Sequence, residues 1–164
     1  MPDIKKEDKN KFNEVQVVIF RLANEEFGLV ISQVREIIRM QDVTPMPKAP
    51  AFIEGVINLR GQIIAVMDLA KRLSLKSAGR TEKSRVIIVE ILGTTIGVMV
   101  DEVPEVLRLA EKNIEPAPEV FESKVHSDFI KGVGKFDKRL IILLDVDKII
   151  SKEEARQVPG NQAK

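Results

Sequence analysis

The sequence contains one pattern written twice, and this repeat constrains the fold more than any other feature. Residues 17–39 match 86–108, 44–47 match 115–118, 52–56 match 129–133, and 63–73 match 140–150. The matched positions include glycines, prolines and the aspartates Asp68 and Asp145, so shared β-branched residues alone do not explain the agreement. Four matches in the same order indicate two copies of one structural unit.

Each copy is predicted to consist mainly of short strands. VVIFRL and EEFGLVI are β-branched runs joined by a short polar turn, and FIEGVIN and QIIAVMDL form a second hairpin around Leu59-Arg60-Gly61. The fold class is therefore all-β with minor short helices, as two small barrels or curled sheets. In ISQVREIIR, apolar residues at 31, 34, 37 and 38 predict a helix of barely two turns. Its counterpart contains Pro104, which predicts a shorter or irregular element there.

The repeat also sets the expected domain boundaries. A flexible N-terminal tail is expected over 1–14 and one domain over 15–150, with copies at about 15–76 and 84–150. Whether the copies exchange strands is left open. A polar, mobile C-terminal tail is expected over 151–164. The N-terminus lacks the apolar stretch of a signal peptide, and acidic residues interrupt the long apolar runs, so no transmembrane helix is expected.

Composition excludes several classes of function. The chain has no cysteine, which removes disulfides, thiol nucleophiles and thiolate zinc sites. A net charge of +1 without Trp or Tyr disfavours a nucleic-acid surface. The single histidine, His126, lies in a polar insert without a plausible nucleophile or second metal ligand, and Asp68 and Asp145 suit capping better than catalysis. We therefore predict no enzyme activity, no catalytic residue, no metal and no cofactor.

Two features are candidates for partner contact. The turn arginine Arg60 has no counterpart in the second copy, where residues 135–139 form a polar loop, so the fold does not require it. It is either a solvated turn residue or, beside an exposed Leu59, part of an interface. The apolar stripe from Ile31 to Ile38 is either core or a second contact surface.

These residues carry a resemblance to a known family. PAFIEGVINLRGQIIAVMDL is similar to the G-V-x-N-L-R-G-x-I-x-P-V-x-D-L pattern of the CheW family, with Ala65 where the family commonly has proline. IGVMVDEVPEVLRL and IKGVGKFDKRLIILLDVDKII also resemble the family, and the similarity runs from about Val15 to Ile150. The resemblance implies two SH3-like five-stranded β-barrels related by internal duplication. It also implies a cytoplasmic, non-enzymatic adaptor without a cofactor.

The resemblance further implies partners and the residues that meet them. The adaptor would couple chemoreceptor signalling tips to the regulatory domain of the histidine kinase CheA, in ring-shaped arrays peripheral to the membrane. The receptor-facing groove would include Ile31, Val34, Ile37, Val100 and Val103. The kinase-facing surface would include Thr44, Met46, Gly55, Arg60 and Ile63, with a second kinase contact near Glu119 and Val120. At the position of Val120 the family often has an aromatic residue, whereas this sequence has valine, with Phe121 adjacent.

Alternatives of other kinds stay open at this point. A CheA fragment or a CheV-type protein would carry the same module, as would a CheW-like module of another chemosensory pathway. A small-barrel nucleic-acid-binding module and an unrecognised enzyme are the alternatives from other functional classes.

Overall fold

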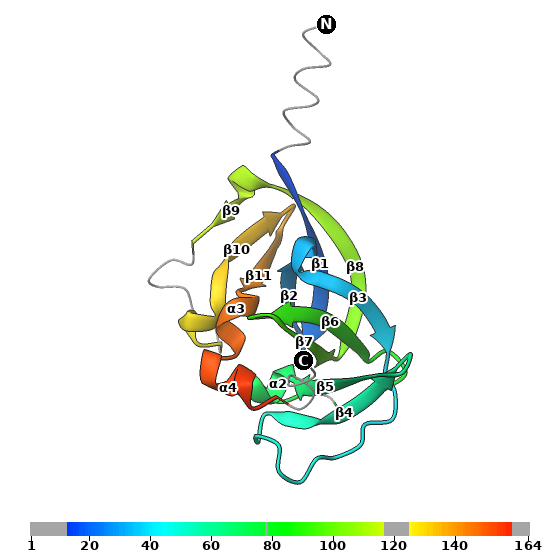
Figure 1. The fold of residues 1–164 in the computed structure, drawn as a ribbon. Helices are drawn as coiled ribbons and strands as arrows, with labels where there is room; N and C mark the ends of the chain where they lie inside the picture. The colour runs from blue at the N-terminus through cyan, green and yellow to red at the C-terminus, as the bar shows by residue number, and fades with distance from the viewer. Residues whose placement is uncertain (1–12, 78, 117–124, 159–164) are drawn as a thin grey trace, which may run out of the picture.

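The computed structural model describes residues 13–77, 79–116 and 125–158, which form mainly β-strands (Figure 1). The strands are β1 (Glu14–Leu22), β2 (Glu25–Val30), β3 (Val34–Arg39), β4 (Ile53–Leu59), β5 (Gln62–Asp68), β6 (Arg85–Ile91), β7 (Thr94–Val100), β8 (Glu102–Ala110), β9 (Ile114–Glu115), β10 (Ile130–Phe136) and β11 (Arg139–Leu144). The short helices are α2 (Leu69–Arg72), α3 (Val146–Ile149) and α4 (Lys152–Arg156), with 3₁₀ turns η1 (Ile31–Gln33), η2 (Glu111–Asn113) and η3 (Ser127–Phe129). The predicted all-β class is confirmed.

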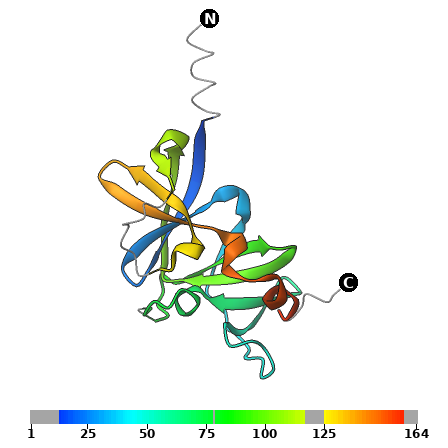
Figure 2. The same ribbon diagram turned by 90° about the vertical axis from the view of Figure 1, so that its left-hand side faces the viewer.

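The strands form two sheets, and each sheet combines both copies of the repeat. One sheet has the order β8-β1-β2-β11-β10-β9 and the other β3-β6-β7-β5-β4. We call them the six-stranded barrel and the five-stranded barrel, and in Figure 2 the first lies above the second. The first hairpin of each copy, β1–β2 or β6–β7, lies in the barrel that holds the closing hairpin of the other copy. It joins that hairpin through a parallel pair, β2 with β11 and β7 with β5. The two copies are thus interlocked through exchanged strands.

Equivalent residues of the repeat occupy equivalent places. A bulge precedes Gly55 in β4, which lies opposite Val66, and the same bulge precedes Gly132 in β10, which lies opposite Leu143. Asp68 caps α2 with a side chain that accepts from Lys71 N, and its counterpart Asp145 caps α3 with a side chain that accepts from Asp147 N. The repeat in the sequence is therefore a repeat of backbone structure.

Each barrel has its own small core, and a larger core lies between them. The five-stranded barrel encloses Ile57, Leu59, Ile64, Val66, Val86, Ile88 and Met99. The six-stranded barrel encloses the corresponding set Val17, Ile19, Leu109, Ile141 and Leu143. The other faces of both sheets meet in what we call the shared core, which includes Phe20, Phe27, Leu29, Ile87, Val89, Val98, Val100, Ile142 and Leu144. Each inner strand is buried on both faces, which explains its nearly continuous apolar sequence.

The helix predicted from the stripe 31–38 is wrong. Residues 31–33 form η1, and β3 begins at Val34 and pairs with β6. A bulge between Val34 and Glu36 shifts the register, so that Val34 and Ile37 lie on the same face of the strand. A bulged strand thereby imitates the three-residue spacing of a helix. The counterpart of this stripe is also a strand, β8, with Pro104 at the register shift against β1, a position where a strand tolerates proline.

The C-terminal segment is only partly the polar tail that the sequence predicts. Ser151 and Glu154 form a reciprocal capping box that starts α4. Ala155 and Val158 are buried in the shared core. The chain therefore remains part of the folded domain at least as far as Val158.

Candidate partner-binding surfaces

The turn between β4 and β5 presents Arg60 to solvent. Leu59 pairs with Gln62, so Arg60 and Gly61 alone form the loop, with φ values of 52° and 88°. Two consecutive residues with positive φ match the twist of a tight hairpin. The side chain of Asn58 accepts a hydrogen bond of 2.8 Å from Gly61 N and secures the turn. The backbone thus fixes where the Arg60 side chain starts, although both loop residues, and not only the glycine, adopt positive φ.

Leu59 does not form the exposed apolar neighbour that the sequence predicts. Its side chain is 8% exposed and lies inside the five-stranded barrel. Arg60 instead forms an ion pair with Glu36 of β3, in which its guanidinium donates a hydrogen bond to the carboxylate. This hydrogen bond raises the pKa of Arg60, so the guanidinium remains charged. The hairpin turn is therefore connected directly to the strand that carries Val34 and Ile37.

The glutamate of this pair is the partner residue that sequence reasoning missed. Glu36 corresponds to Glu105 of β8, which accepts a hydrogen bond of 2.8 Å from Arg139 Nη2. Arg139 also binds Glu26 through both oxygens, at 3.1 and 2.9 Å, and its pKa is raised by the hydrogen bonds to Glu26 and then Glu105. In both barrels an arginine of the closing hairpin holds the same glutamate. The sequence could have indicated this partner, because the repeat places a glutamate at both equivalent positions.

The other residues of the predicted kinase surface lie along the same hairpin. Thr44 pairs with Val56 of β4 through two backbone hydrogen bonds of 2.8 and 2.9 Å. Gly55 packs directly against the backbone of Thr44. A Cβ on Gly55 would lie 2.3 Å from the carbonyl oxygen of Thr44, so the site has no room for a side chain. Met46 and Ile63 are exposed apolar side chains, at 42% and 51%. Gly55 thus shapes the backbone, whereas the two apolar side chains are free to contact a partner.

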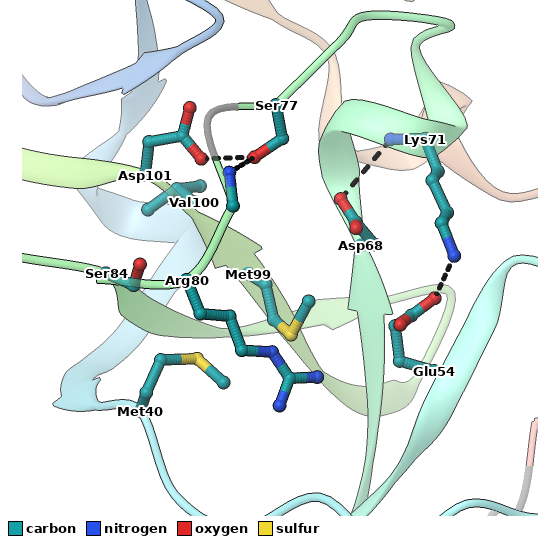
Figure 3. A pocket seen from close by; sticks show the side chains of 11 residues that line it. Met40, Glu54, Asp68, Lys71, Ser77, Arg80, Ser84, Met99, Val100 and Asp101 are labelled. Atoms are coloured by element: carbon teal, nitrogen blue, oxygen red, sulfur yellow. Dashed lines mark hydrogen bonds and ion pairs between the residues drawn. The ribbon is translucent and has the colours of Figure 1, made fainter. Parts of the chain in front are cut away.

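A polar pocket of about 280 Å³ lies beside this hairpin, and it is the natural place to look for chemistry (Figure 3). Glu54 pairs with Lys71 Nζ at 2.8 Å, a hydrogen bond that raises the pKa of Lys71. Asp68 accepts from the backbone of Lys71, and Asp101 accepts from Ser77 Oγ at 2.7 Å and from the backbone amide of residue 23. Each carboxylate of the pocket therefore has a structural partner.

The predicted receptor-facing residues divide into exposed and buried ones. Ile31 and Ile37 are 37% and 36% exposed, and Val34 and Val103 are half-buried against the shared core. Val100 is only 3% exposed within that core, so it supports the surface from beneath and cannot contact a partner directly. This corrects its predicted place in the lining of the groove.

The repeat identifies a further exposed residue on this side, Val106 of β8. It is the counterpart of Ile37 and is 45% exposed. Ile37 pairs with Ile87 and Val106 with Val18, and both of these partners lie in the shared core. Opposite residues of paired strands point to the same face. The end strands of the two sheets therefore each present an aliphatic side chain at the margin of the shared core. Both strands lie away from α3 and α4 (Figure 1).

Glu119 and Val120 lie outside the described residues. His126 Nδ1 accepts a hydrogen bond of 3.1 Å from Asp128 N and so caps η3, which gives it a structural role.

Across the described ranges, His, Cys, Asp and Glu side chains do not gather in threes as a metal site would require. Within the same ranges, none of the helices has the length and apolar character needed to cross a bilayer.

Comparison with known proteins places this arrangement in a family. Residues 16–154 match the CheW-like domain. The chain is 35% identical to the probable chemotaxis protein CheW of Rhizobium etli over 140 residues, covering 85% of this chain and 90% of that protein. It is 37% identical to chemotaxis protein CheW of Thermotoga maritima, covering 85% and 89%. The crystal structure of the scaffolding protein TtCheW from Thermoanaerobacter tengcongensis superposes with a TM-score of 0.77 at 42% identity, covering 84% of this chain and 88% of that one. With its two interlocked SH3-like barrels, the chain belongs to the CheW-like domain family and is an adaptor of chemotaxis signalling.

Proposed function

We propose that the chain is a non-enzymatic adaptor that couples the cytoplasmic tips of chemoreceptors to the regulatory domain of the histidine kinase CheA in receptor arrays. The observation that carries the proposal is the pair of exposed aliphatic residues, Ile37 and Val106, on the end strands of the two barrels. These two side chains would belong to one apolar surface that binds a protein partner.

The receptor tip would bind along β3 and β8. A chemoreceptor tip is an α-helical hairpin, and a helix binds a protein surface through apolar side chains one or two turns apart. Ile31, Val34, Ile37 and Val103, together with Val106, supply the complementary apolar side chains. Val100 would keep this surface in shape from within the shared core.

The kinase would bind the closing hairpin of the five-stranded barrel. Ile63 and Met46 would supply the apolar contacts, and Arg60 a planar set of donors for a carboxylate of CheA. Thr44 and Gly55 would set the backbone that presents them. A second kinase contact at Glu119 and Val120 would allow adaptor and kinase to alternate in a ring.

The absence of enzyme activity is also part of the proposal. In the pocket beside the hairpin, the carboxylates cap a helix or hold a neighbouring side chain. A general base must be within reach of the proton it removes and free to accept it. Carboxylates engaged in this way support a structural pocket.

Separate losses of the two partners would test the proposal. Ile37→Asp should weaken binding to a receptor-tip fragment and spare binding to the CheA regulatory domain, and Ile63→Asp should do the reverse. Leu92→Asp is the matched control, because Leu92 is 41% exposed on the other hairpin of the same barrel. Titration calorimetry with each partner measures the effect. If all three variants bind both partners as the parent does, the proposed surfaces are wrong.

A further inference from the structure

Arg72, the last residue of α2, lies between two equivalent phenylalanines from the two copies of the repeat. Its guanidinium carbon is 5.4 Å from the ring centroid of Phe52 and 5.8 Å from that of Phe129. Each phenylalanine immediately precedes a closing hairpin, Phe52 before β4 and Phe129 before β10. One cation is therefore shared by the two points where the chain enters these hairpins.

Two hydrogen bonds to the C-terminal part of the chain fix the guanidinium in this place. Arg72 Nε donates to the carbonyl oxygen of Ile149 at 2.7 Å, and Nη2 donates to Glu154 Oε1 at 2.7 Å. The same oxygen of Glu154 accepts from Ser151 N at 2.9 Å and starts α4. The side chains of Arg72 and Glu154 are 23% and 27% exposed, so water only partly screens their ion pair.

We propose that Arg72 is a positioning residue that fixes the entry segments of the two closing hairpins relative to each other, with α4 as its support. Phe52 ends the segment that carries Thr44 and Met46, and this segment contains backbone hydrogen bonds from Ala49 N to Met46 O and from Ile53 N to Pro50 O, both 3.0 Å. The step from this geometry to kinase binding depends on the function proposed above. The geometry itself does not.

Through Phe129, Arg72 also contacts the second copy of the repeat. The amide of Phe129 donates a hydrogen bond of 3.0 Å to His126 O. The carbonyl oxygen of Phe129 accepts a hydrogen bond of 2.9 Å from the amide of Asp145, and Asp145 caps α3. A shift of the Phe129 ring would therefore disturb both η3 and the start of α3. Arg72 thus connects one turn in each half of the repeat through a single side chain.

Arginine suits this position better than lysine would. A planar guanidinium contacts aromatic rings and donates from its edge at the same time, whereas an ammonium group cannot make all these contacts in one geometry. The neighbouring Lys71 illustrates this difference within the same helix. It pairs with Glu54 of the same barrel and so connects nothing across the two copies. Lys71→Ala is therefore a control that removes one cation from the same helix turn.

Hydrogen exchange by NMR tests the proposal on the isolated chain. In Arg72→Ala, the amides of Ile53 and Phe129 should exchange faster together by about tenfold, the size expected for loss of a charged hydrogen bond that closes a local opening. Lys71→Ala should leave both rates at the parent level. Arg72→Lys should restore protection in α4, through Glu154, and leave the two phenylalanine segments fast. Full recovery of both segments by lysine would overturn the role of the guanidinium.

A milder variant covers the case in which Arg72→Ala does not fold. Glu154→Gln keeps an oxygen for the capping box and removes the charge that holds Arg72, so both segments should exchange several-fold faster. The proposal is overturned if only one segment responds in either variant, or if neither does. In a parallel titration with the CheA regulatory domain, Arg72→Ala should bind several-fold more weakly than Lys71→Ala. Faster exchange with unchanged kinase binding would support the positioning role and overturn the proposed kinase surface.

Discussion

Replacing Gly55 with alanine should separate the Thr44 segment from β4 and destabilise the domain. The new Cβ would lie 2.3 Å from the Thr44 carbonyl oxygen and 2.8 Å from its carbonyl carbon. Both are backbone atoms, so no side-chain rotation relieves the overlap. The backbone must move apart, which breaks or stretches the two hydrogen bonds between Thr44 and Val56, now 2.8 and 2.9 Å long.

The magnitude follows from these contacts. Overpacking a tight site costs about 1–3 kcal/mol, and each lost hydrogen bond about 0.5–1.5 kcal/mol. The free energy of unfolding should therefore fall by about 2–6 kcal/mol. Urea unfolding followed by circular dichroism is the suitable assay, because the chain has no Trp or Tyr for fluorescence. Binding to the CheA regulatory domain should weaken as well, since Thr44 and Met46 move with the segment.

Two other glycines make the reasoning refutable. Gly132→Ala places its Cβ 2.7 Å from the carbonyl oxygen of Glu115, again a backbone atom, and should behave like Gly55→Ala. Gly134→Ala meets Leu109 Cδ1 at 2.7 Å, the end of a side chain that can rotate, and should cost only about 1 kcal/mol. If Gly55→Ala loses less stability than Gly134→Ala, the backbone overlap is not what decides the cost.

Four further substitutions have definite expected outcomes. Arg60→Ala should leave the thermal midpoint unchanged, because its ion pair is solvent-exposed, and should weaken binding to CheA in titration calorimetry; parent-like binding would remove Arg60 from the interface. Val100→Asp should lower the free energy of unfolding by about 3–5 kcal/mol in urea, whereas Ile37→Asp should change it little; equal effects would contradict the assigned burial. Arg139→Ala should cost about 1 kcal/mol after allowance for solvent screening, since it frees two carboxylates, and a thermal melt indistinguishable from the parent's would show that these pairs contribute nothing.

The repeat made most of the fold predictable, because two copies of one pattern restrict the architecture far more than propensity does. It located the hairpins, the capping aspartates and the equivalent glycines Gly55 and Gly132. The repeat could not show whether the first hairpin of each copy pairs with the closing hairpin of its own copy or with that of the other copy. The inner strands of both copies are apolar on both faces, so β2 would fit against β5 or β11 equally well by pattern alone.

The failures each have a local physical cause. The bulge between Val34 and Glu36 gave a strand the spacing of a helix. The C-terminal helix was missed, although Ser151 followed three residues later by Glu154 is a capping-box signal, because polar residues outnumber the two that become buried. Leu59 was expected outside because it adjoins a turn, yet a two-residue loop keeps the strand alternation intact up to Leu59 itself.

The candidate site was predictable to a smaller extent. Sequence identified Arg60, Met46 and Ile63, which are exposed, but it could not find the ion pair that joins Arg60 to β3. Such a contact depends on how two strands far apart in the sequence approach each other. Val100 was assigned to the groove through the resemblance to the CheW family, yet it is buried, whereas its counterpart Ile31 is exposed. These two positions of the repeat also differ in backbone structure, because Ile31 lies in η1 and Val100 is the last residue of β7.

The exchange of strands has a consequence for how the chain is made. When β1, β2 and β3 emerge from the ribosome, β6, β8 and β11, the strands of the second copy that they pair with, have not yet been synthesised. Among the strands of the first copy, only the hairpins β1–β2 and β4–β5 can close before the second copy is made. The pairs that complete both barrels join residues far apart in the chain, which favours slow folding. A cut in the connection between α2 and β6 would leave two halves, each with open strand edges shaped for the other. Such halves would pair with one another, or with the halves of a second molecule, sooner than fold alone.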